Sequence, residues 1–254
     1  MPEPERALFL HSLPDTLPPG ISRIYAGAEF CPWRLPGSSQ LRQILRRAHD
    51  LGCAFTLVTP VLIEPLREAL RAALAALLAE FAAGDEVVIS DWGALELVRE
   101  VDPAVPVVLG RVLSGQKRDA RTVELELTAA QLEHFRQGSW YAGPAVALLL
   151  ELGIRRVELD NLLQGVAPLP AALHGTLHIP YAMVASSRNC PFRSPGLASP
   201  CPQPCGEVFS LVSTESAEPL LQGGNTQFLR VERLPDDLTA LNIDRVVEHL
   251  ELPR

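Results

Sequence analysis

The chain has 254 residues, of which 47% are hydrophobic, 20% are charged and 6% are aromatic, and its formal net charge is −8. This apolar fraction excludes a disordered chain, and the acidic balance argues against a protein held mainly by nucleic-acid phosphates. The length allows one domain of α/β-barrel size or two smaller domains, each with a full core.

The first two-thirds of the chain alternates strand-like and helix-like segments. Short apolar and β-branched runs predict strands over residues 21–26, 54–59, 86–90, 105–112 and 155–160. Apolar residues at helical spacing predict helices over residues 38–51, 64–83, 91–99 and 143–152. Asp91 is expected to cap the third of these helices.

These segments also indicate how the strands are connected. Strands that are apolar on both faces and are separated by helices predict a parallel sheet with βαβ crossovers. Five or six such units favour an α/β fold of the (β/α) TIM-like barrel type, either complete or incomplete and distorted, over an open doubly wound sheet. No glycine fingerprint follows the first strand and no GxxxxGK[ST] motif occurs, so a standard phosphate-binding loop is not predicted.

The composition changes after Pro180. Five prolines and three cysteines lie between residues 185 and 206, where neither helical nor strand periodicity is present. Strand-like runs return over residues 207–213 and 226–232, and a helix is predicted over residues 236–250. Because no internal repeat or long linker divides the chain, we expect a single barrel domain over residues 1–254 with a long cysteine-bearing loop at about 185–206.

The N-terminal segment does not have the pattern of a secretory signal peptide. Its apolar run over residues 7–10 is too short, and Glu3 and Glu5 stand where a basic region would be. The longest apolar stretch contains Arg71 and Glu80 and is shorter than a membrane span. We therefore expect a cytoplasmic protein without a membrane span, in which clustered cysteines indicate metal binding or catalysis rather than disulfides.

The cysteines divide into a group of four and a single residue. Cys190, Cys201 and Cys205 form a C-x10-C-x3-C pattern on the loop, and Cys31 follows the first predicted strand. The carboxyl ends of parallel barrel strands share one face, so Cys31 and Cys190 can converge there. Cys53 lies between a helix end and a buried strand and is expected to be a core residue.

Four thiolates at one point suit an iron–sulfur cluster or a structural zinc ion, and four unrelated thiols remain the alternative. Zinc sites are usually built from close cysteine pairs, whereas this chain offers only one such pair, spaced at x3. Cys-Pro steps occur at three of the four cysteines and are also found in bacterial cluster-binding sequences. The pattern therefore favours a cluster.

The passages RIYAGAEFCPWR (residues 23–34) and HIPYAMVASSRNC (residues 178–190), together with the C-x10-C-x3-C spacing, resemble the U-thirty-two peptidase-like family. The resemblance implies a TIM-like barrel that holds a [4Fe–4S] cluster through Cys31, Cys190, Cys201 and Cys205. It also implies a heterodimer with a paralogous subunit that carries out oxygen-independent hydroxylation in ubiquinone biosynthesis. The substrate would be a small aromatic or quinone-precursor molecule.

Two other interpretations stay open beside this one. The chain could be a non-catalytic scaffold subunit whose metal site only fastens the loop, or an RNA-hydroxylating member of the family, although the acidic charge makes a nucleic-acid partner unlikely. Proteolysis is not predicted, because neither an HExxH nor a GxSxG motif occurs.

Polar residues near the predicted strand ends are the candidates for catalysis. Arg188 and Arg193 bracket Cys190, where cationic side chains would offset the charge of a thiolate-bound cluster or hold an anionic substrate. Glu29 and His178 are further candidates, although a histidine at the end of a barrel strand is more often a core or rim residue than a catalytic one. Other polar residues at this predicted face are Arg34, Asp91, Arg111, Glu158, Asp160, Asn161 and Tyr181.

Overall fold

Eight parallel strands form a closed barrel. The computed structural model describes residues 3–12, 14, 16–193, 200–214 and 216–253. Around the barrel the strands follow the order β1-β12-β7-β6-β5-β4-β3-β2. Their bounds are β1 Glu5–Phe9, β2 Ile21–Gly27, β3 Ala54–Val58, β4 Glu86–Ile89, β5 Val107–Leu109, β6 Arg156–Asp160, β7 His174–Ile179 and β12 Ile243–His249. The predicted TIM-like barrel is thus confirmed, and it is complete.

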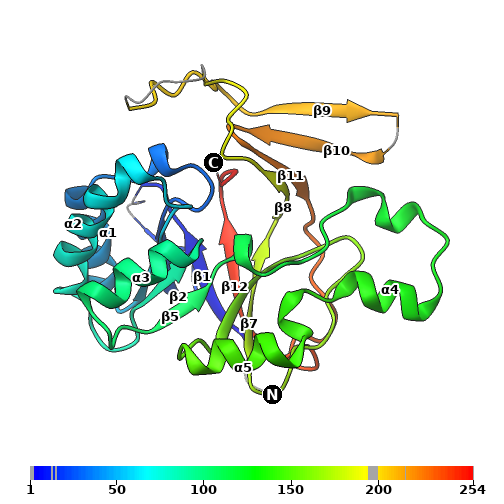
Figure 1. Ribbon diagram of the computed structural model, residues 1–254, viewed down its shortest axis with the longest axis horizontal. Helices are drawn as coiled ribbons and strands as arrows, with labels where there is room; N and C mark the ends of the chain where they lie inside the picture. Colours follow the sequence, from blue (N-terminus) through cyan, green and yellow to red (C-terminus); the bar gives the residue numbers. More distant parts are fainter. Residues whose placement is uncertain (1–2, 13, 15, 194–199, 215, 254) are drawn as a thin grey trace.

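Helices follow several of the strands and cover the outside of the barrel. Their bounds are α1 Ser38–Asp50, α2 Arg67–Leu78, α3 Trp92–Val101, α4 Ala129–Arg136 and α5 Gly143–Glu151. α1, α2 and α3 lie together on one side of the barrel (Figure 1). Asp91 caps α3 as predicted, because its Oδ1 accepts a hydrogen bond from the Ala94 amide at 2.8 Å.

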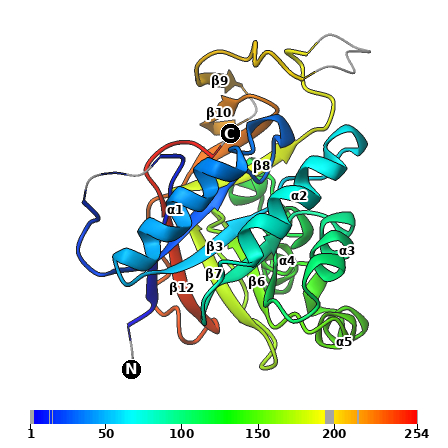
Figure 2. The ribbon, with the colours of Figure 1, turned by 90° about the vertical axis from the view of Figure 1, so that its left-hand side faces the viewer.

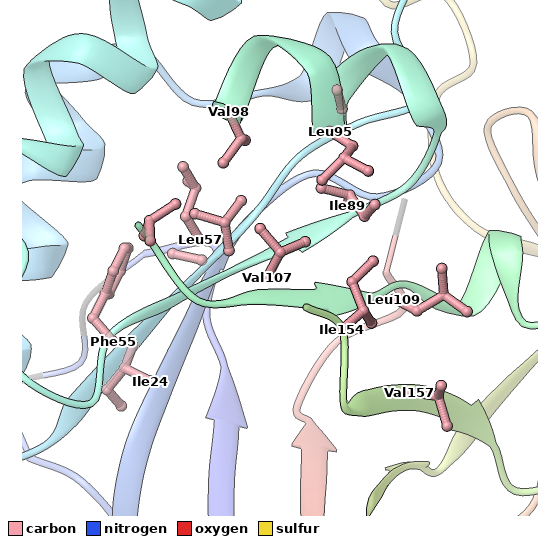
Figure 3. Packing of buried hydrophobic residues seen from close by; sticks show 14 of the residues in the cluster. Ile24, Phe55, Leu57, Ile89, Leu95, Val98, Val107, Leu109, Ile154 and Val157 are labelled. Atoms are coloured by element: carbon pink, nitrogen blue, oxygen red, sulfur yellow. The ribbon is translucent and has the colours of Figure 1, made fainter. Parts of the chain in front are cut away.

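The two faces of the barrel strands have different surroundings. Outward-facing side chains such as Leu57, Ile89 and Val107 gather beneath Leu95 and Val98 of α3 in the main core (Figure 3). Inward-facing side chains form a separate apolar cluster inside the barrel, made of Ala7, Phe9, Tyr25, Val58, Val88, Val108 and Val247. Buried charged residues also lie inside the barrel, where Glu158 and Arg245 both bond to the Tyr25 hydroxyl.

A second, antiparallel sheet interrupts the barrel between β7 and β12. It consists of β8 Tyr181–Ser186, β9 Phe209–Ser213, β10 Ser216–Gly223 and β11 Thr226–Arg230, in the order β8-β11-β10-β9. Figures 1 and 2 show this sheet at the end of the barrel opposite the N-terminus, where the carboxyl ends of the barrel strands lie. Met183 and Phe228 of the sheet pack there against Phe30 and Leu252.

The prediction of a helix over residues 236–250 is wrong. Asn242 has a φ of 58°, which breaks the helix, and the following residues form β12. This strand pairs with β1 on one side and β7 on the other, so it closes the barrel. A short apolar run fits a helix or a buried strand equally well, and here the need for a last barrel strand decides the outcome.

Two smaller differences concern the N-terminal half. The sequence shows only a short apolar run where the structure has the strand β1. The helix predicted over residues 64–83 is shorter in the structure, where a 3-10 turn at Glu64–Leu66 precedes α2. Across the described parts of the chain, no helix has the length and apolar character required to traverse a bilayer. The single domain over residues 1–254 stays a prediction.

Candidate functional site

Four of the five cysteines line one pocket at the carboxyl end of the barrel. Cys31 directly precedes the 3-10 turn Pro32–Arg34 that follows β2, and the other three lie on the segment between β8 and β9. The pocket is partly open to solvent and has a cavity volume of about 60 Å³. All four cysteines are half-buried free thiols, whereas Cys53 is buried in the core as predicted.

The thiols in this pocket influence one another electrostatically. Burial raises the pKa of the Cys31 thiol, and the Trp33 amide and Arg34 only partly offset that effect, while Cys190 and Cys201 raise it further. A second thiolate is therefore unfavourable beside the first unless a positive charge is present.

Three arginines supply part of that positive charge. Arg34, Arg188 and Arg193 line the same pocket. The Arg34 guanidinium donates to Cys205 Sγ at 3.7 Å. The Arg193 guanidinium carbon lies 4.6 Å from the centre of the Trp33 ring, which fixes its position by a cation–π contact. Arg188 and Arg193, both predicted from sequence, therefore lie beside the cysteines.

The four cysteines can be compared with what a zinc ion and an iron–sulfur cluster each require. Within the residues that the structure describes, no set of three or more His, Cys, Asp or Glu side chains converges on one point where a metal ion could bind. A zinc ion needs four ligands at one point, with sulfur atoms about 2.3 Å away. In a [4Fe–4S] cluster each thiolate binds a different iron atom, so the sulfurs surround the group from farther apart. The structure thus brings the four cysteines to one pocket, but the described residues do not form a metal-ion site as they are placed.

Glu29 does not line the cysteine pocket but belongs to a buried ion-pair network beside it. Arg111 donates to Glu29 Oε2 at 2.6 Å and to Asp160 Oδ1 at 3.0 Å, and Arg118 donates to Asp160 Oδ2 at 2.8 Å. The Arg111 guanidinium also lies over Phe30, which lines the pocket, with 5.1 Å between its central carbon and the ring centre. The network thus supports the wall of the cysteine pocket.

The two acids in this network respond differently to burial. Burial raises the pKa of Glu29 despite the opposing effect of Arg111. Burial acts in the same direction on Asp160, but Arg118, Arg111 and the Met183 amide outweigh it and hold the pKa of Asp160 below its usual range. Asp160 is therefore ionised, which is consistent with a structural role in holding the two arginines.

His178 is also buried inside the barrel and does not reach the cysteine pocket. Its Nε2 contacts Glu158 Oε2, and its Nδ1 lies 2.8 Å from His249 Nε2. Tyr25 donates its hydroxyl proton to the other oxygen of Glu158 at 3.1 Å. The pKa of His178 lies well below its ordinary value, mainly because of burial and secondarily because of repulsion by Arg111.

The remaining candidates have structural partners. Asn161 donates to the Arg233 carbonyl at 2.9 Å, and the Tyr181 carbonyl accepts from Arg111 at 3.1 Å. Sequence reasoning missed Tyr25 and His249. The two-residue period of β2 could have identified Tyr25 as facing inward, whereas His249 was assigned to a helix.

The buried histidines should make the stability of the protein depend on pH. Burial lowers the pKa of both His178 and His249 well below 6.5. The unfolded chain takes up protons on these residues below about pH 6.5, while the folded protein does not. We therefore expect the free energy of unfolding to fall as the pH drops below this value, by up to about 1.4 kcal/mol per pH unit for each histidine.

Urea unfolding between about pH 7 and about pH 5 measures this dependence. The exposed His134 offers the matched control, and His134→Gln should leave the slope unchanged. A slope that is the same in the wild type and in His249→Gln would contradict the assignment of His249 as neutral in the folded protein.

Comparison with known proteins bears on the fold. No protein-family model and no curated protein matches the chain. Among solved structures, the U32 peptidase Mk0906 resembles it with a TM-score of 0.50, covering 99% of this chain and 94% of that chain at 14% sequence identity. The barrel fold resembles that of this U32 peptidase structure. At this identity the likeness concerns the fold alone.

Proposed function

We propose that the protein is an iron–sulfur subunit of the UbiV type, which acts with a paralogous UbiU-like subunit in oxygen-independent hydroxylation during ubiquinone biosynthesis. The observation that carries this proposal is the gathering of Cys31, Cys190, Cys201 and Cys205 around one pocket. These residues come from two distant segments of the chain and coincide with the pattern by which the sequence resembles the family. The U32-type barrel is compatible with the proposal.

In this proposal each of the four thiolates binds one iron atom of a [4Fe–4S] cluster. The cluster would supply one-electron transfer when bound. Arg34, Arg188 and Arg193 offset the negative charge of the thiolates and offer donors to an anionic or phenolic group of the substrate. The half-buried position of the cysteines limits the access of water to the pocket.

The placement of the cysteines also favours a second function, that of a scaffold subunit. Cys31 belongs to the barrel, whereas the other three ligand candidates belong to the segment between β8 and β9. A metal group bound by all four would fasten that segment to the barrel even without taking part in turnover. The two functions can be separated by measuring the activity of a complex in which the cysteines of one subunit at a time are replaced. If this chain is a scaffold, only the replacement of the partner's cysteines abolishes the reaction.

Metal analysis of anaerobically purified protein tests the proposal. We expect a brown protein with about four iron and four sulfide per chain. Cys190→Ser and Cys205→Ser should each lose most of the iron, whereas Cys53→Ser should retain it, because Cys53 lies in the core. A colourless protein, stoichiometric zinc, or equal iron content in the Cys190 and Cys53 variants would contradict the proposal.

A further inference from the structure

Four side chains, those of Tyr25, Glu158, His178 and His249, form a row of hydrogen bonds across the interior of the barrel. Arg245 donates to the Tyr25 hydroxyl at 2.8 Å, and this hydroxyl donates to Glu158, which contacts His178. His178 in turn pairs with His249. The exposed fractions of Tyr25, Glu158, His178 and His249 are between 0% and 3%. We call these four residues the interior chain.

The charges around the interior chain are balanced without Glu158. Four arginines in the barrel and at its mouth form ion pairs with four carboxylates. The arginines are Arg23, Arg111, Arg118 and Arg245, and the acids are Glu5, Glu29, Glu86 and Asp160. Glu158 is a fifth carboxyl, and its ion-pair partner within the described residues is His178 alone. A neutral interior therefore requires one additional proton on the Glu158–His178 pair.

Electrostatic effects place this proton on Glu158 rather than on His178. Burial raises the pKa of Glu158, although Arg245, Arg156, the Tyr25 hydroxyl and Arg111 act in the opposite direction. Burial, Arg111 and Arg245 lower the pKa of His178, while Asp160 acts in the opposite direction. Among the described residues, the charged or titratable groups that face the interior chain from neighbouring elements are His11, Arg23, Glu29, Glu86, Arg111, Arg156, Asp160 and Arg245.

His249 lies at the outer end of the interior chain and has one unsatisfied atom. Its Nδ1 is buried and finds no hydrogen-bond partner among the residues that the structure describes. The ring stacks on Phe9 with 4.9 Å between the ring centres. Phe9 and Leu250, the residue after His249, both line a hollow at the barrel mouth that also contains His11. An unpaired buried nitrogen here is costly unless a water or another small group visits and forms a hydrogen bond with it.

We propose that Glu158, His178 and His249 form a proton-transfer site that releases one proton at His249 Nδ1 toward this hollow. In the resting form Glu158 carries the proton and donates to His178 Nε2. His178 then carries its own proton on Nδ1 and donates to His249 Nε2, and His249 is protonated on Nδ1. The acceptor is water or a small weak base in the hollow.

The transfer step balances with a single proton. When Nδ1 of His249 loses its proton, Nε2 of His249 receives the Nδ1 proton of His178, and Nε2 of His178 receives the proton of Glu158. Glu158 becomes a carboxylate, both rings stay neutral and change from the Nδ1–H to the Nε2–H tautomer, and no electron moves. This site is independent of the cysteine pocket, so it does not rest on the proposed iron–sulfur function.

Nitrogen-15 NMR of the histidines in the full chain tests the proposal. In the wild type we expect His178 and His249 to be Nδ1–H tautomers near neutral pH and to change together to Nε2–H as the pH rises. In Glu158→Gln the amide group donates permanently to His178 Nε2, so both rings should stay Nδ1–H at every pH. In Tyr25→Phe the carboxylate loses a donor, and the tautomer change should move to higher pH.

Three results would overturn the proposal. They are Nε2–H tautomers throughout the pH range, a doubly protonated His178 ring at neutral pH, and rings that remain Nδ1–H in the wild type up to the pH of unfolding. The wild-type titration decides among these outcomes even if one of the variants does not fold.

Discussion

Replacing Arg111 with methionine is expected to lower the free energy of unfolding by about 3–5 kcal/mol. The Arg111 side chain is completely buried and pairs with both Glu29 and Asp160. Methionine retains much of the apolar stem but removes the positive charge, so Glu29 loses its guanidinium partner and Asp160 keeps only Arg118. An uncompensated carboxylate in the barrel is the source of the loss.

Urea denaturation at neutral pH measures this difference, and Arg121→Met provides the matched control. Arg121 pairs with Asp119 on the surface, with both side chains about half exposed, and exposed pairs contribute less than about 1 kcal/mol. Similar changes in the two variants would show that the Arg111 network does not stabilise the fold. Adding Glu29→Gln to Arg111→Met should recover part of the loss, because it removes the unpaired charge.

Replacing Gly27 with alanine is expected to destabilise the protein by more than about 4 kcal/mol or to prevent folding. Gly27 ends β2 with a φ of 139°, a conformation that residues with a side chain rarely adopt. A Cβ at this position would lie 2.0 Å from the Val58 carbonyl oxygen of the neighbouring strand. The backbone of β2 or β3 would have to move, and with it Glu29 and Cys31.

Soluble yield and thermal unfolding measure the effect of Gly27→Ala. The control is Gly143→Ala at the start of α5, where an added Cβ meets no atom within 4 Å. We expect a Tm close to that of the wild type for the control. A Gly27 variant with a Tm close to the wild-type value would show that the β2–β3 contact is looser than the structure indicates.

The barrel was predictable because its strands and helices differ in local period. The runs at β3 and β4 are apolar on both faces, and the helix after β4 starts at a recognisable cap, Asp91. β12 was not predictable in the same way. Its residues DRVVEH combine charges with two valines, and its strand conformation depends on hydrogen bonds to β1 and β7.

The cysteine pocket was anticipated from the positions of Cys31 and Cys190 after predicted strands. The buried networks were not, because their partners are far apart in the sequence and share no motif. Tyr25 and Glu158, for example, are separated by 133 residues and meet only after the barrel closes. A sequence pattern can show that His178 faces inward, but only the closed barrel shows that it meets His249 rather than a substrate.

The antiparallel sheet has a topological consequence. The chain leaves the barrel after β7 and returns before β12, and these two points touch, since the Val231 amide donates to the Pro180 carbonyl at 2.6 Å. Because β7 and β12 are neighbours in the barrel, residues 181–230 form an insertion whose two ends lie side by side. The barrel contributes Cys31 and residues 181–230 contribute the other three cysteines, so the pocket forms where these two parts of the chain meet.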